Sequence, residues 1–113
     1  MSKFQEAVTN YKSEFDKLGI KYDEALLTAV TKGCGPSIYN PDSSKVSSSD
    51  QAELDRVKNN FLIKKLGLSE SDGLDAAIKD VVEQFGSSNR NKYRAMFYYL
   101  LVKKYGKESV YEK

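Results

Sequence analysis

The chain has 113 residues, of which 40% are hydrophobic and 30% charged, and its formal net charge is +2. This length suits one domain with its own core, and the small net charge gives the whole molecule no electrostatic preference for nucleic acid or membranes. The sequence contains no histidine, which removes the commonest acid–base residue and most zinc sites. We therefore expect a single helical domain over residues 1–113 that is not an enzyme and holds no cofactor or metal ion.

The cellular location is predicted from three features of the sequence. The longest uncharged apolar run, Ala95–Val102, has eight residues, far fewer than the roughly 20 that span a membrane. No apolar signal-peptide region follows Lys3. The single cysteine, Cys34, excludes an internal disulfide and fits a reducing compartment. We expect a soluble, cytoplasmic protein without a membrane partner.

Apolar residues recur at steps of three and four in five segments, which predicts an all-α fold. The first of these stripes contains Phe4, Val8, Tyr11 and Phe15. No segment shows the sustained alternation that is typical of a strand. The predicted helices cover residues 3–18, 23–33, 49–66, 71–85 and 89–105.

Capping residues mark the ends of these predicted helices. Asp23 is a suitable N-cap for the second helix, and Ser48 and Gln51 have the spacing of a capping box for the third. Glycines are expected as left-handed C-terminal caps after each helix. These glycines are Gly19, Gly33, Gly67, Gly86 and Gly106.

A long loop over residues 34–48 separates the second and third predicted helices. It holds both prolines and three apolar residues, Ile38, Tyr39 and Val46. The loop is either ordered by packing these side chains on the core, which we expect, or is a binding loop on a rigid scaffold. Cys34 opens the loop just past a helix end, where a thiolate is not stabilised, so we expect a buried apolar residue and no nucleophile.

The fifth predicted helix carries the clearest hint of a site. Its middle is apolar on almost every side, which predicts a central, buried helix. Its start is basic, although cations oppose the dipole there. Good N-cap residues and forked guanidinium groups together form a candidate anion site. The residues of this candidate site are Ser88, Asn89, Arg90, Lys92 and Arg94.

The alternative explanation of these basic residues is neutralisation within the fold. Residues 69–86 carry five acidic residues and one lysine, whereas residues 87–107 carry six basic residues and no acidic one. The acidic fourth helix would then neutralise the basic fifth, through exposed pairs that contribute about 0–1 kcal/mol each.

Eight tyrosines favour an interaction surface, because tyrosine is enriched at interface hot spots. Tyr39, Tyr99 and Tyr105 are the candidate residues of that surface. The leading functional hypothesis is therefore a non-enzymatic binding module that contacts a protein partner or a second copy of itself. The alternative is a module that binds an anionic ligand, a nucleotide or nucleic acid, at the start of the fifth helix.

Four motifs together resemble a family of small bacterial proteins that is known only as a domain of unknown function. They are PSIYN at 36–40, NNFLIKKLGL at 59–68, SNRNKYRAMFYYLL at 88–101 and GKESVY at 106–111. The resemblance extends from Phe4 to Tyr111. It implies a bacterial source and a standalone helical domain, and it implies no activity, cofactor or catalytic residue.

Overall fold

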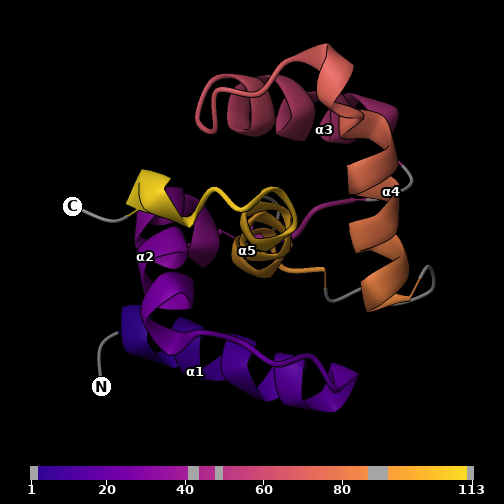
Figure 1. The fold of residues 1–113 in the computed structure, drawn as a ribbon. Helices are drawn as coiled ribbons and strands as arrows, with labels where there is room; N and C mark the ends of the chain where they lie inside the picture. Colours follow the sequence, from indigo (N-terminus) through magenta and orange to yellow (C-terminus); the bar gives the residue numbers. More distant parts are fainter. Residues whose placement is uncertain (1–2, 41–43, 48–49, 87–91, 112–113) are drawn as a thin grey trace.

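The computed structural model describes residues 3–40, 44–47, 50–86 and 92–111, and this part of the chain is helical (Figure 1). An isolated antiparallel bridge between Lys45 and Tyr93 is the nearest approach to a sheet in these ranges. The all-α prediction is confirmed. The elements in chain order are α1 (Lys3–Leu18), α2 (Glu24–Cys34), η1 (Gly35–Tyr39), α3 (Gln51–Arg56), η2 (Val57–Ile63), η3 (Glu70–Asp72), α4 (Leu74–Phe85), α5 (Arg94–Tyr105) and η4 (Glu108–Tyr111).

Helix α5 forms the centre of the molecule. Figure 1 looks along its axis, with α1, α2, α3 and α4 arranged around it. Seven of its twelve residues are buried, as expected for a helix that is apolar on every side. Although α5 is the most buried helix, no helix among the described residues is long and apolar enough to cross a membrane.

Helices α1, α2 and α4 each turn one apolar face toward this centre. The ring of Phe15 in α1, for example, lies 5.3 Å from the ring of Tyr99 in α5. Aromatic pairs at this separation add a specific contact to the burial of apolar area. The buried residues of α1, α2 and α4 are Val8, Tyr11, Phe15, Leu26, Leu27, Val30, Thr31, Leu74, Ala77, Ile78, Val81 and Phe85.

The start of α2 is as predicted, and the start of α3 is not. The Asp23 carboxylate accepts hydrogen bonds from the backbone N–H groups of Ala25 and Leu26, so its role as N-cap is confirmed. The N-cap of α3 is Asp50, whose carboxylate accepts from the N–H of Ala52. The capping role predicted for Ser48 is therefore wrong, and Ser48 itself lies outside the described residues.

The third predicted helix, over residues 49–66, is divided between two kinds of helix. It begins at Gln51 and is α-helical to Arg56, after which η2 is a π-helix to Ile63. Backbone hydrogen bonds that span five residues continue past it, from the N–H of Leu66 to the carbonyl of Phe61. Apolar residues at steps of three and four do not distinguish α from π winding over so short a segment.

Glycines end helices as predicted at four of the five expected positions, Gly19, Gly67, Gly86 and Gly106, which all have positive φ. The fifth, Gly33, lies inside α2, and Gly35, with φ 66°, is the C-cap in its place. Gly73, with φ 68°, separates η3 from α4. The fourth helix therefore begins at Leu74 and not at residue 71, because a left-handed residue breaks the helical path.

The described part of the loop, residues 34–40 and 44–47, packs on the core through two of the three apolar side chains expected to hold it. Ile38 and Val46 are buried, whereas Tyr39 is 48% exposed. The N–H of Val46 donates to the carbonyl of Lys92 at 2.7 Å, and the N–H of Arg94 donates to that of Ser44 at 2.7 Å. This pairing holds the chain extended before α5, so that the fifth helix begins at Arg94 and not at residue 89.

Candidate anion-binding site

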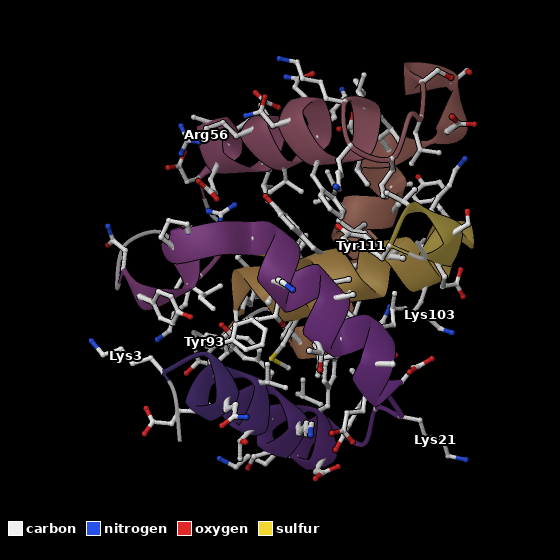
Figure 2. The ribbon with its side chains drawn as sticks, turned by 90° about the vertical axis from the view of Figure 1, so that its left-hand side faces the viewer. Lys3, Lys21, Arg56, Tyr93, Lys103 and Tyr111 are labelled. Carbon is white, nitrogen blue, oxygen red and sulfur yellow. The ribbon has the colours of Figure 1, made fainter. Side chains whose placement is uncertain are left out.

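A cavity of about 420 Å³ lies between the helix formed by α3 and η2 on one side and α2, η1, α5 and η4 on the other. This volume lies within the range of small-molecule sites. Figure 2 shows two of its lining residues, Arg56 on α3 and Tyr111 from the C-terminal η4. We call it the Arg94 cavity, and its lining residues are Gly33, Cys34, Ser37, Arg56, Asn60, Phe61, Lys65, Arg94, Tyr98 and Tyr111.

The charged residues that line the Arg94 cavity are all positive. Arg56, Lys65 and Arg94 line it, and none of its ten lining residues is acidic. Two other cavities of about 420 Å³ are balanced. The one between α3 and α4 has two aspartates and two lysines, and the one between α1 and α2 has Lys12 and Glu24, which form an ion pair. Of these three cavities, the Arg94 cavity alone has an excess of positive charge.

Glu53 does not line the cavity, but it forms ion pairs with both arginines that do. Its carboxylate, on a residue that is 8% exposed, accepts hydrogen bonds from Nη2 of Arg56 at 2.7 Å and from Nη2 of Arg94. Burial opposes ionisation of this carboxyl, but the hydrogen bonds and charges of the two arginines outweigh it and lower the pKa of Glu53. Three cations and one carboxylate leave the cavity and its wall with a net charge of +2.

Arg94 is held in position by an aromatic wall as well as by Glu53. Its Nη1 donates to the hydroxyl of Tyr98, one turn along α5, at 2.9 Å. The ring of Tyr98 is stacked on that of Phe61, with centroids 3.9 Å apart and planes 11° apart. These contacts tie α5 to η2 and fix the direction of the guanidinium group.

Tyr111 forms the wall contributed by η4. The Nζ of Lys65 lies 5.2 Å from the centre of its ring, a cation–π distance. On α2, a Cβ built at Gly33 would lie only 3.2 Å from Cε1 of Tyr111. Gly33 therefore gives the ring room to pack against the helix, a role that the prediction of a C-terminal cap did not include.

Cys34 lines the cavity as a neutral thiol. Burial raises its pKa to about 11, although the charge of Arg94 opposes this shift. At neutral pH the thiol is protonated and therefore adds no negative charge to the cavity. Within the described ranges, no three acidic or cysteine side chains come together as a metal site.

A family model described as a protein of unknown function (DUF2853) matches residues 10–109. The chain belongs to this family. The match includes every residue that lines the Arg94 cavity except Tyr111. It confirms the resemblance to a domain of unknown function and assigns no activity. No curated protein matches the chain.

The predicted anion site at the start of the fifth helix is only partly described by the structure. Ser88, Asn89 and Arg90 lie outside the described residues. Lys92 precedes α5, is 4% exposed and does not line the cavity, and burial lowers its pKa. Arg94 is the predicted residue that the structure places in the cavity.

The three tyrosines of the predicted interaction surface differ in exposure. Tyr39 is exposed. Tyr105 is half-buried, and its hydroxyl donates to the carbonyl of Asp72 at 3.0 Å. Tyr99 is 1% exposed, so its assignment to a surface is wrong. Its hydroxyl is satisfied inside the protein, where it accepts from the N–H of Asp23 at 2.6 Å.

A helical period of 3.6 residues does not predict the cavity wall that Arg56, Asn60, Phe61 and Lys65 form. In an α-helix, residues five and nine positions after Arg56 point about 140° and 180° away from it. A π-helix winds more slowly and brings residues about five apart into line. Arg56 precedes the π-helical η2 and Lys65 follows it, so the slower winding between them brings onto one cavity wall four residues that a 3.6-residue period scatters.

Proposed function

We propose that the protein is a non-enzymatic binding module for a small anionic molecule, which it holds in the Arg94 cavity. The observation that carries this proposal is the charge of the cavity, whose lining has three cations and no acidic residue. The π-helix in its wall is a second support, because π-helical turns are frequent at functional sites.

Arg56 is the residue best placed to contact such a ligand. Its side chain is 59% exposed, although its Nη2 donates to Glu53. A guanidinium group has five N–H donors in a planar fork that matches carboxylate and phosphate oxygens. Arg94, whose side chain is 14% exposed, contributes positive charge from the cavity wall.

The titratable groups of the cavity favour binding over catalysis. A general acid or base works best with a pKa near the working pH. The pKa of Cys34 is raised to about 11, those of Tyr98 and Tyr111 are raised by burial, and that of Glu53 is lowered. None of these shifts produces a proton donor or acceptor that titrates near neutral pH.

A protein partner or self-association remains a prediction with less support. Tyr99 is buried and the hydroxyl of Tyr105 is bound to Asp72, so the expected surface retains only Tyr39 as an exposed ring. A cytoplasmic location and a bacterial source also stay predictions.

The proposal is tested by comparing two variants that each lose one positive charge from the same stretch of helix. Ribose 5-phosphate is titrated at low salt into the wild type, Arg56→Gln and Lys64→Gln, with the Kd measured by calorimetry. Arg56→Gln should weaken binding by about 10- to 150-fold, because a hydrogen bond to a charged group contributes about 1.5–3 kcal/mol. Lys64 is exposed and does not line the cavity, so Lys64→Gln should change the Kd less than about twofold.

Equal losses in the two variants would show non-specific attraction to a basic surface and would contradict the proposal. So would a wild type that does not bind ribose 5-phosphate at millimolar concentration. Circular dichroism of both variants serves as the check that the helices are intact.

A further inference from the structure

The Arg94 cavity has two chemically different ends. At one end Arg56 and Arg94 surround Glu53, and at the other Lys65 lies over the ring of Tyr111. Arg56 and Lys65 are nine residues apart, one before and one after the π-helix η2. Figure 2 shows Arg56 and Tyr111 toward opposite ends of the helix formed by α3 and η2.

Tyr111 offers a ring face for stacking. The other two rings of the cavity, Phe61 and Tyr98, stack on each other, whereas no ring among the described residues pairs with Tyr111. Its face is covered by Lys65, a long and exposed side chain that can move aside or lie over a second ring. The edge of the ring lies so close to Gly33 that a Cβ there would come within 3.2 Å of Cε1.

We propose that the ligand is a phosphate monoester that carries a planar aromatic ring, as a nucleoside monophosphate does. The ring stacks on Tyr111 beside Lys65, and the phosphate lies at Arg56 and Arg94. This inference rests on the proposed function and adds the class of ligand to it.

Charge and polarity along the cavity agree with such a ligand. The cations and Glu53 give a net charge of +2, and a phosphate monoester carries about −1.5 to −2 at pH 7. Between the two ends, Asn60 of η2 lines the cavity. Its amide can both donate to and accept from hydroxyl groups, such as those of a ribose.

The test measures how much a nucleobase tightens the binding of a sugar phosphate and which residue is responsible for that gain in affinity. Adenosine 5′-monophosphate and ribose 5-phosphate are titrated into the wild type, Tyr111→Leu and Tyr111→Phe. In the wild type the adenine base should tighten binding by about 5- to 150-fold, the gain expected from stacking on an aromatic side chain. Tyr111→Phe should keep this gain, because it keeps the ring. Tyr111→Leu should lose most of this gain, so that its Kd values for the two ligands differ by less than about twofold.

The two ligands separate failure of this inference from failure of the proposed function. If ribose 5-phosphate binds in an Arg56-dependent way but adenosine 5′-monophosphate binds no more tightly, the anion site stands and the aromatic ligand is excluded. If Tyr111→Leu weakens both ligands equally, Tyr111 does not act by stacking, and the inference is overturned. If neither ligand binds, the proposed function fails as well.

Discussion

At the scale of single residues, Glu53 couples the Arg94 cavity to the stability of the fold. Its carboxylate is the shared partner of Arg56 and Arg94, and it is nearly inaccessible to water. A buried carboxylate between two guanidinium groups holds both in place, while it cancels one of their two charges. The same residue therefore both orients the arginines and limits how strongly they attract an anion.

The pH dependence of this contribution follows from the lowered pKa of Glu53. Because the carboxyl has a lower pKa in the folded than in the unfolded state, its contribution is fully present above the unfolded value, about 4.5. That contribution is lost as the pH falls through the folded pKa. Glu53→Gln should therefore lower the free energy of unfolding by about 1–3 kcal/mol at pH 7. The difference from the wild type should shrink below about pH 4.5, which urea unfolding at pH 7 and pH 3 measures. An equal difference at both pH values would show that the charge of Glu53 is not its cause.

Removal of the same carboxylate should also strengthen anion binding. In Glu53→Gln the net charge of the cavity and its wall rises from +2 to +3, so ribose 5-phosphate should bind several-fold more tightly at low salt. Glu83→Gln is the control, because Glu83 is an exposed residue of α4 outside the cavity. Unchanged or weaker binding by Glu53→Gln, or the same gain in the control, would contradict the electrostatic account.

At the scale of secondary-structure elements, α5 shows what hydrophobic patterning can predict. Its uncharged middle predicts burial on all sides, and the structure confirms this. The start of α5 could not be predicted from local sequence, because the pairing of Lys45 with Tyr93 holds the preceding chain extended. That contact joins residues 48 positions apart, and no helical signal in either segment predicts it.

Composition also did not predict which helix supplies the buried ion-pair partner of the basic fifth helix. Charge counts favoured α4, and within the described ranges Lys104 of α5 does pair with Asp80 of α4, at 2.8 Å. The buried pair of Arg94, however, is with Glu53 in α3. Composition indicates which segments attract each other, whereas the crossing of the helices decides which side chains meet.

The packing of α2 against α5 gives a prediction about Tyr99. Tyr99→Phe removes the acceptor of the Asp23 N–H group in a partly buried place, so it should lower the free energy of unfolding by about 1–3 kcal/mol. Tyr105→Phe removes an exposed hydrogen bond to Asp72, which water can replace, and should cost less than about 0.5 kcal/mol. Urea unfolding of both variants provides the comparison. If the two variants lost equal stability, the buried hydrogen bond of Tyr99 would not be a special support of the helix pair.

At the scale of the whole molecule, the four outer helices and the central α5 form one compact unit. The radius of gyration is 13.1 Å, close to the value of about 13 Å expected for a single domain of this length. The number of helices and their order were predictable, because each long helix has its own apolar stripe. The cavity was not, because it requires α2, α3, α5 and three short helical segments to meet. Among its residues, only Arg94 was predicted from the sequence to belong to a binding site, as part of a basic cluster.

The most direct test of the central claim is the location of a bound anion on this fold. Inorganic phosphate is titrated at low salt into isotopically labelled protein, and amide chemical shifts are followed by NMR. The account predicts shifts at Cys34, Arg56 and Arg94, three positions far apart in sequence that line one cavity, and their reversal by added salt. Shifts scattered over the exposed lysines, or none at these three positions, would contradict it.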